Sequence, residues 1–396
     1  MGRQFRSLTF TVHKWLGLHL SLFMAFLFLT GSVLVVASEL ELVFRPNVWT
    51  TVQDQERTAS FGTIYDTVKS TDSVRAINVI EKYPGAWLTD KVYVATSEGP
   101  KVMWTDPTSG AVVDTTQVVG FRSVLRDLHD NLLLDHRVGY LLVSGISILM
   151  LGLIVSGLIS YRRFWKGFLR RPSDRAGRRG YLGGLHRLLA VWSGVLMLLI
   201  AVSSFVFFLG GLGISGKTAA PGPAQERTEV LPADFAGARI DQAEAIARTA
   251  LPGFEPSVMV PPRNPRGGIV FSGSWDGGPP LLGAARVVID PVTMEVMAAL
   301  TPSDNTGIAR LKPLIDKLHF GTWGGLFSKL LWLGFGLAGF GVALSGMMTF
   351  AARQSGPLSG DAGVMRQVWS GLGLFRWVYA LLALGIFAAA SYHYAL

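Results

Sequence analysis

Long runs of apolar residues constrain this chain more than any other feature. Five windows of this kind lie at 16–38, 138–160, 185–209, 330–350 and 372–390. The hydrocarbon core of a bilayer is about 30 Å thick and a helix rises about 1.5 Å per residue, so runs of about 20 apolar residues predict spanning helices. The composition agrees, because 49% of the 396 residues are hydrophobic and only 16% are charged. The sequence therefore predicts an α-helical integral membrane protein.

One basic segment predicts the orientation of these helices. The stretch YRRFWKGFLRRPSDRAGRRG at 161–180 has eight arginines and lysines but a single acid, Asp174. Segments of this kind stay on the cytoplasmic side of the inner membrane. A basic run can also bind nucleic acid, but its place between two spans explains this one, so we expect no nucleic-acid partner. The N-terminus is then cytoplasmic, and the first apolar run, too long for a signal peptide, is expected to stay as an anchor.

Two long connections are predicted to lie on the outer, periplasmic side. The first contains FGTIYDTVKS followed by alternating segments with a DPTSG turn, and the second contains DQAEAIARTA followed by similar segments with a DPVT turn. A helical stretch followed by strands with polar turns predicts a small α+β domain in each connection. The chain has no cysteine, so no disulfide stabilises either domain.

The two halves of the chain also resemble each other. His13 in VHKWLGL matches His186 in LHRLLAV at an offset of 173, and His129 matches His319 at an offset of 190. Matches in constant order predict one internal duplication, in which each half is helix, outer domain, helix. A fifth, C-terminal helix has no counterpart. The predicted segments are helix 1–38, domain 39–130, helix 131–160, basic loop 161–184, helix 185–210, domain 211–322, helix 323–350, cytoplasmic loop 351–371 and helix 372–396.

The duplication places histidines in pairs. His13 and His186 begin the first and third spans, and His129 and His319 each end an amphipathic stretch on the outer side. Zinc usually takes four protein ligands, whereas haem iron needs only one or two axial ligands, so two imidazoles suit haem. Many glycines in the spans would leave room for a flat macrocycle, although close helix packing explains them equally well.

Three further histidines lie near these positions. His136 follows His129 by seven residues, and we expect both on one face of a single helix, so His136 is a further candidate ligand. His19 lies about 120° around the first helix from His13, where helix packing is favoured over ligation. His393, near the outer end of the fifth helix, is expected to be an interfacial residue.

The histidine motifs resemble those of a known family. VHKWLGL, LHDNLLL, LHRLLAV and LHFGTWGGLF, with the ending SGMMTF, resemble the PepSY-associated transmembrane family over nearly the whole chain. Within this family the resemblance is to inner-membrane ferric-siderophore reductases, and it implies two b-type haems held by the paired histidines, PepSY-like periplasmic domains and a hydroxamate-type ferric siderophore as substrate. The electron donor would be a quinol or a cytoplasmic reductase, because the sequence has no nucleotide-binding fingerprint.

Two other classes of function stay open at this point. A transporter for a metal or a siderophore would also place histidines in its spans, along the path of its substrate. A membrane-anchored binding module would use the helices only to hold its periplasmic domains. Haem content separates both classes from a reductase.

Overall fold

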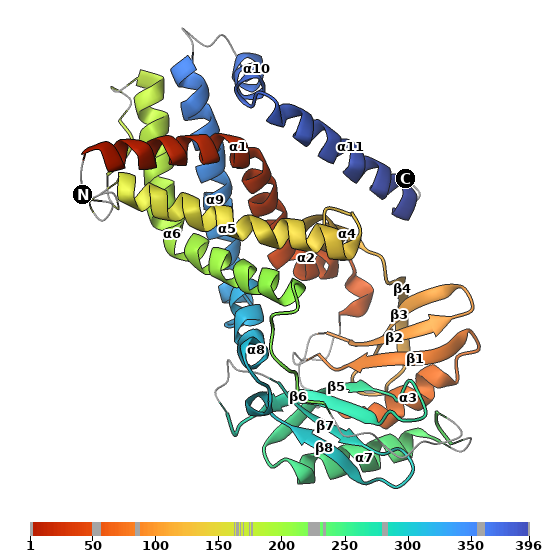
Figure 1. Cartoon of the computed structure of the whole chain (residues 1–396). Helices are drawn as coiled ribbons and strands as arrows, with labels where there is room; N and C mark the ends of the chain where they lie inside the picture. The colour runs from red at the N-terminus through yellow and green to blue at the C-terminus, as the bar shows by residue number, and fades with distance from the viewer. Residues whose placement is uncertain are drawn as a thin grey trace. The chain divides into compact units, whose positions relative to one another are not determined.

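The computed structural model divides the chain into two compact units (Figure 1). It describes residues 3–49, 57–83, 88–161, 177–220, 230–232, 235–278, 284–354 and 361–394, together with 163, 166, 168, 170–173 and 175 of the basic loop. The helical unit comprises Met1–Ser38, Val124–Ile214 and Asp316–Leu396, and the sheet unit comprises Glu39–Ser123 and Ser215–Ile315. Each unit therefore draws on both halves of the sequence.

Four long apolar helices form the core of the helical unit. They are α1 (Arg3–Val35), α5 (His136–Ser160), α6 (Gly177–Gly211) and α9 (Gly325–Gln354). All four are long and apolar enough to cross a membrane, which confirms the helices expected for the first four apolar runs. α1 and α6 each pack against both α5 and α9. Their common core contains methionine, alanine and phenylalanine side chains, among them Met24, Met150 and Met347.

The C-terminal segment differs from the single fifth helix that the sequence predicts. It forms α10 (Asp361–Gly371), inside the predicted loop 351–371, followed by α11 (Phe375–Tyr394). The two pieces meet at an angle of 108° and make a fifth span only if they are counted together. The side chain of His393 lies outside the described residues.

One continuous sheet forms the centre of the sheet unit. The first half contributes α2 (Ala37–Val43), the 3-10 helix η1 (Pro46–Val48) and α3 (Phe61–Lys69), and the second half contributes α7 (Gly237–Ala250) and the 3-10 helix η4 (Pro302–Asp304). The strands are β1 (Val74–Glu81), β2 (Asp90–Thr96), β3 (Gly99–Thr105), β4 (Val112–Gln117), β5 (Phe254–Val260), β6 (Ile269–Trp275), β7 (Ala284–Ile289) and β8 (Val296–Leu300). Their order in space is β4-β3-β2-β1-β5-β6-β7-β8, all antiparallel.

The expectation of two separate outer domains is therefore wrong in one respect. Each half has the expected order of one helix and four strands, but β1 and β5 pair edge to edge through Ile80 with Met259 and Glu81 with Val258. This pairing gives hydrogen-bond partners to two strand edges that would otherwise be exposed. The amphipathic helices α4 (Phe121–Asp130) and α8 (Ile308–His319) then continue the chain from each half, as the sequence predicts.

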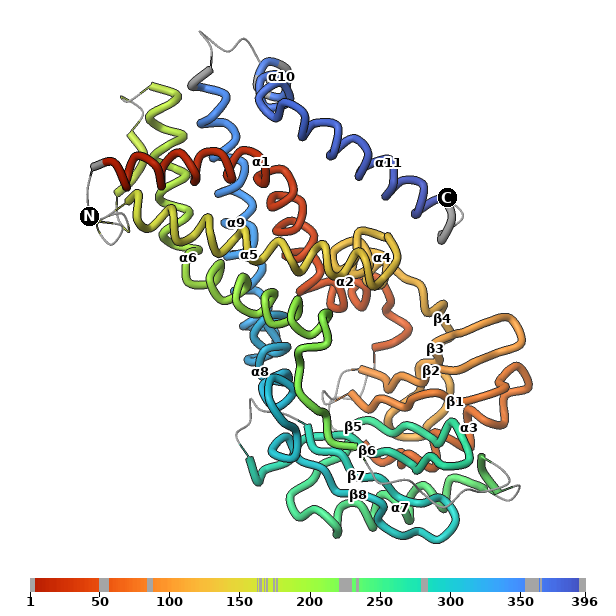
Figure 2. The backbone as a smooth tube through the Cα atoms, in the orientation of Figure 1, coloured from red at the N-terminus to blue at the C-terminus, as the bar shows by residue number. Residues whose placement is uncertain are grey.

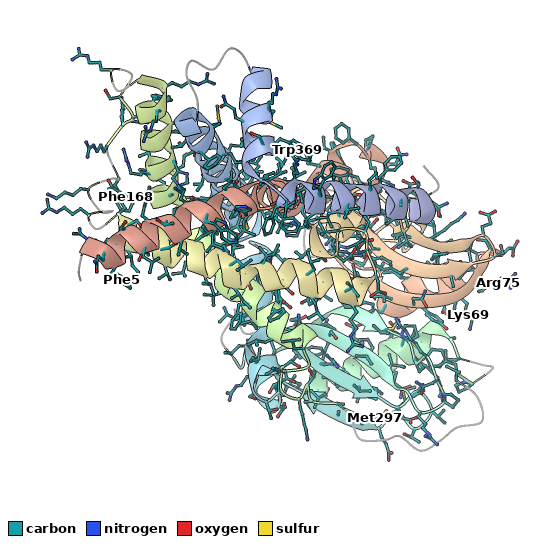
Figure 3. The ribbon with its side chains drawn as sticks, turned by 45° about the horizontal axis from the view of Figure 1, so that its top comes forward. Phe5, Lys69, Arg75, Phe168, Met297 and Trp369 are labelled. Atoms are coloured by element: carbon teal, nitrogen blue, oxygen red, sulfur yellow. The ribbon has the colours of Figure 1, made fainter. Side chains whose placement is uncertain are left out.

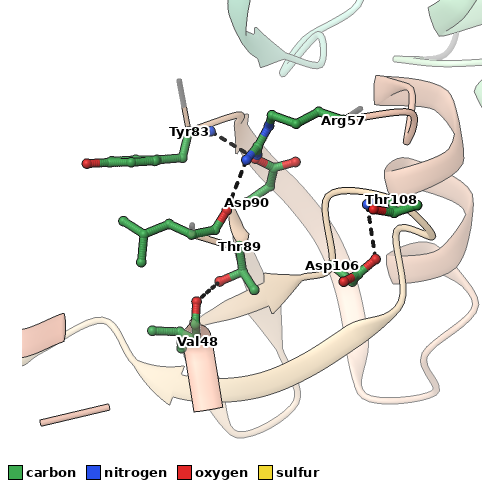
Figure 4. Close-up of polar contacts among 8 residues, drawn as sticks. Val48, Arg57, Tyr83, Thr89, Asp90, Asp106 and Thr108 are labelled. Atoms are coloured by element: carbon green, nitrogen blue, oxygen red, sulfur yellow. Dashed lines mark hydrogen bonds and ion pairs between the residues drawn. The ribbon is translucent and has the colours of Figure 1, made fainter. Parts of the chain in front are cut away.

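Alternating side chains explain how the strands form their core. In β2 every second residue is buried, beginning with Asp90 and continuing through Val92 and Val94. The apolar members of this set join Phe61 and Ile64 of α3 in the core of the sheet unit. Figure 4 shows the polar end of β2, where the buried carboxylate of Asp90 pairs with Arg57 and accepts a hydrogen bond of 2.8 Å from the Tyr83 backbone N–H.

Helices α3 and α7 of the sheet unit cap each other at their N-terminal ends. The Gly62 N–H donates to Asp241 Oδ1 at 2.8 Å, and the Gly237 N–H donates to Asp66 Oδ1 at 2.7 Å. A carboxylate near a helix N-terminus satisfies a free N–H group and interacts favourably with the helix dipole. A Cβ atom on Gly62 would lie 2.2 Å from the Gly237 carbonyl oxygen, so the helices can approach this closely only where both residues are glycine.

Replacing one of these carboxylates should destabilise the junction between the halves. We expect Asp241→Ala to lower the free energy of local opening at the start of α3 by about 1–2 kcal/mol, because the Gly62 N–H loses its acceptor. Hydrogen exchange of the full-length protein should show faster exchange at residues 60–66. The exposed Asp72→Ala serves as the control, and equal exchange in both variants would contradict the capping role.

Candidate functional site

Two of the predicted histidines lie side by side in the helical unit. His13 comes from α1 and His186 from α6, and their ring centroids are 6.4 Å apart with the rings tilted by 65°. Two imidazoles on opposite sides of one metal ion have their centres about 6 Å apart, because each metal–nitrogen bond is about 2 Å and the ring centre lies about 1 Å beyond the nitrogen. The spacing of the two rings therefore fits one metal ion between them.

The neighbouring helices fix the orientation of both rings. His13 Nδ1 lies 3.1 Å from the Leu153 carbonyl oxygen and 3.0 Å from Ser156 Oγ, both on α5. On α9, the Val342 carbonyl oxygen lies 2.9 Å from His186 Nδ1. A carbonyl oxygen can only accept a hydrogen bond, so these partners assign the proton to Nδ1 in both rings. Nε2 then carries the lone pair that a metal needs.

A second pair of histidines makes equivalent contacts. His129 of α4 lies with Nδ1 3.0 Å from Thr30 Oγ1 of α1, and His319 of α8 lies with Nδ1 2.8 Å from Ser203 Oγ of α6. Both hydroxyl groups donate their own proton to a backbone carbonyl of their helix, so each accepts from the imidazole. Nε2 is again the bare nitrogen in both rings.

Burial favours the neutral form of His129 and His319. Burial lowers the pKa of His129 to about 4. Burial also lowers the pKa of His319 to about 3, and the nearby His129 lowers it further. An imidazole with so low a pKa is uncharged at neutral pH, and the neutral form is the one that binds metal ions.

Glycines make room for three of these four rings. A Cβ atom on Gly31 would lie 2.8 Å from His129 Cε1, and Cβ atoms on Gly157 and Gly346 would lie 3.2 Å from His13 Cε1 and 3.3 Å from His186 Cε1. These contacts are tighter than side chains normally make, so larger residues would displace the imidazoles. Each glycine directly follows a serine or threonine whose hydroxyl oxygen lies near the same imidazole, so the absence of a side chain lets the ring approach that hydroxyl group.

The ligand set fits haem better than a bare metal ion. Each site offers two imidazoles, and no group of three or more histidine, aspartate or glutamate side chains that could hold a metal occurs in the described part of the chain. Zinc and most other protein-bound ions need more protein ligands than two. Haem supplies four nitrogens itself and needs only the axial pair.

His136 does not share a helix with His129, which corrects one prediction. α4 ends at Asp130, α5 begins at His136, and between them Leu132 and Leu133 have φ angles of 59° and 58°. These left-handed residues turn the chain, and the seven-residue spacing therefore has no helical meaning. His136 is exposed, with its ring 5.7 Å from that of Tyr140.

His19 faces aromatic side chains and not the histidine pairs. Its Nδ1 bonds to the Trp15 carbonyl oxygen at 2.8 Å, and its ring lies 4.5 Å from that of Trp15 and 4.6 Å from that of Phe375 on α11. Stacking of this kind fits the packing role favoured for His19.

The hydroxyl groups that orient the rings were not predicted from the sequence. Ser156 and Ser345 stand in similar Ser-Gly pairs at 156–157 and 345–346, and Ser345 Oγ lies 3.4 Å from His186 Nδ1. Nothing in these pairs indicates a contact with histidine. Thr30 and Ser203, 173 residues apart, carry no local signal, although they share the offset of His13 and His186.

The apolar helices with paired histidines and the separate antiparallel sheet define a membrane protein that also has a β-rich unit. A family model described as PepSY-associated TM region matches residues 10–353. The chain therefore belongs to the PepSY-associated transmembrane family, which confirms the resemblance seen in its motifs. No curated protein matches the chain.

A larger residue at Gly31 should displace the ring of His129. We expect Gly31→Ala to lower the free energy of unfolding by about 1–3 kcal/mol, because its Cβ would press on a ring held by Thr30. Gly194→Ala is the matched control, since a Cβ there meets nothing within 4 Å and alanine favours a helix. Thermal unfolding of the full-length protein in detergent measures both, and equal melting temperatures would contradict the tight contact.

Proposed function

We propose that this protein is a di-haem membrane reductase that delivers electrons to a ferric siderophore and releases the iron as Fe(II). The observation that carries the proposal is the presence of two histidine pairs whose Nδ1 atoms all bond to a neighbouring helix, which leaves Nε2 for a metal. His13 and His186 would hold one haem b and His129 and His319 the other. Bound haem iron supplies reversible one-electron chemistry.

The chain's own groups prepare both sites for this role. The hydrogen bond at Nδ1 fixes the tautomer and the ring orientation, and such bonds raise the basicity of a ligating histidine. His13 and Thr30 lie 17 residues apart on α1, which is about 25 Å measured along the helix. The two sites therefore lie near opposite ends of α1, and two cofactors would divide the path of the electron between them.

The proposed orientation places the sheet unit in the periplasm. The basic loop at 161–184 supports a bacterial inner-membrane location with this loop and the N-terminus in the cytoplasm. Phe168 of this loop is labelled in Figure 3. Its carbonyl oxygen accepts a hydrogen bond of 2.8 Å from the indole N–H of Trp192 on α6. The inner pair would then face the electron donor, a quinol or a cytoplasmic reductase, and the outer pair the substrate.

Reduction weakens the hold of a siderophore on its iron. Ferric iron is a hard ion that hydroxamate oxygens bind tightly, and the added electron lowers its charge. The overall reaction transfers one electron from the donor to each ferric chelate. A hydroxamate-type siderophore is the proposed substrate class, on the basis of the family resemblance.

Histidine substitutions test the cofactor. We expect two haems per chain in the purified protein, one after His13→Ala or His186→Ala, and one after His129→Ala or His319→Ala, because each loses an axial nitrogen. The haem-to-protein ratio from the absorption spectrum measures this. His136→Ala is the control and should keep both haems. A protein without a Soret band would favour a transporter or a binding module instead.

The substrate is tested by reoxidation. We expect protein reduced with dithionite, and freed of excess reductant, to return to its oxidised spectrum when a ferric trihydroxamate is added, while a ferrous-specific chelator captures the product. A gallium complex of the same ligand is the control, because gallium(III) has the charge of ferric iron but is not reduced. An unchanged reduced spectrum would argue against this substrate class.

A further inference from the structure

The hydroxyl group of Tyr379 bonds to the backbone of another helix. Tyr379 lies on α11, and its hydroxyl donates to the His19 carbonyl oxygen of α1. The Tyr379 hydroxyl group also lies near the Phe23 backbone N–H. In a regular α-helix the carbonyl of residue 19 and the N–H of residue 23 bond to each other. The tyrosine hydroxyl therefore donates to the acceptor of one helical hydrogen bond.

α1 is not straight. Figure 2 shows that α1 bends part-way along its length. α1 contains no proline, and a side chain that enters the backbone ladder is one of the few causes of a sharp bend. A hydroxyl group that donates to the His19 carbonyl oxygen is a side chain of this kind.

Aromatic contacts hold α11 at this place. The Trp15 ring lies 6.0 Å from that of Phe375, and the His19 ring contacts both, tilted against Trp15 and edge to face with Phe375. Phe375 and Tyr379 are four residues apart and so project from the same side of α11. These contacts direct the hydroxyl toward the backbone of α1.

The carbonyl that Tyr379 contacts lies between the parts of α1 that serve the two histidine pairs. His13 precedes His19 and meets α5 and His186, whereas Thr30 and Gly31 follow His19 and contact His129. A change in the bend would therefore move one site relative to the other. The repeat gives α6 the same two duties through His186 and Ser203, but it gives no counterpart of α11.

We propose that Tyr379 is a positioning residue whose hydroxyl holds the bend of α1 and thereby sets the orientation of His13 in the inner site. The assignment gives the C-terminal helix a role in the site although it contributes no ligand. The effect on the inner site rests on the proposed function, whereas the effect on the bend does not.

The bend is tested without any cofactor. The chain has no cysteine, so Phe5→Cys and Leu29→Cys, both at exposed positions, one before and one after His19, allow two spin labels to be attached to α1 of the full-length protein. We expect Tyr379→Phe to lengthen the distance between the labels, because the His19 carbonyl oxygen then no longer accepts from Tyr379 and can bond to Phe23 alone, as in a straight helix. Tyr181→Phe, at an exposed position on α6, is the matched control. An unchanged distance in Tyr379→Phe would overturn the proposal.

The inner site is tested by its spectroscopic signature. In a His319→Ala background, which isolates the inner site, we expect Tyr379→Phe to shift the electron paramagnetic resonance g-values and the midpoint potential while haem content is retained. Phe375→Leu, which keeps the hydroxyl, should leave both values closer to those of the parent. A longer label distance with unchanged g-values and potential would overturn the effect on His13. A longer distance in a protein that binds no haem would support the bend and overturn only the proposed function.

Discussion

The hydrogen bond between an imidazole Nδ1–H and a neighbouring helix is the interaction on which the candidate site depends. A polar ring among apolar helices is costly unless its donor is satisfied. Each of the four paired histidines meets this need with a carbonyl or hydroxyl oxygen of a spanning helix. The same bond orients the ring and selects the tautomer, so the requirement that makes these histidines tolerable also prepares them as ligands.

The helices meet this requirement in the same way at both histidine pairs. At His13 and His186, α1 and α6 carry the histidines while α5 and α9 supply the oxygens. At His129 and His319, α1 and α6 supply the oxygens, through Thr30 and Ser203, to histidines on α4 and α8. Two helices therefore take part in both sites, and any change in their shape is felt at each. This dependence explains why a contact from α11, which carries none of the paired histidines, to the backbone of α1 can matter to the site.

Much of the site could be predicted from sequence, and the errors have identifiable causes. His13 and His186 were paired by their offset, and their rings lie 6.4 Å apart. His136 was placed on the helix of His129 because nothing in the sequence marks Leu132 and Leu133, which are poor residues for a left-handed turn, as the place where that helix ends. Ser156 and Thr30 were missed because a hydroxyl is recognised as a partner only when the rotation of its helix is known. The single sheet was missed because edge pairing between β1 and β5 leaves no mark in either strand.

The sequence alone determined that this chain has membrane-spanning helices, that its other segments form helix-and-strand modules, and that its histidines come in related pairs. These properties depend on hydrophobicity, periodicity and spacing, which are local. The tertiary structure decided which oxygen meets each imidazole, how two modules share a sheet, and where α11 contacts α1. These depend on contacts between segments more than a hundred residues apart, and the geometry of such contacts is fixed only when the helices and strands pack.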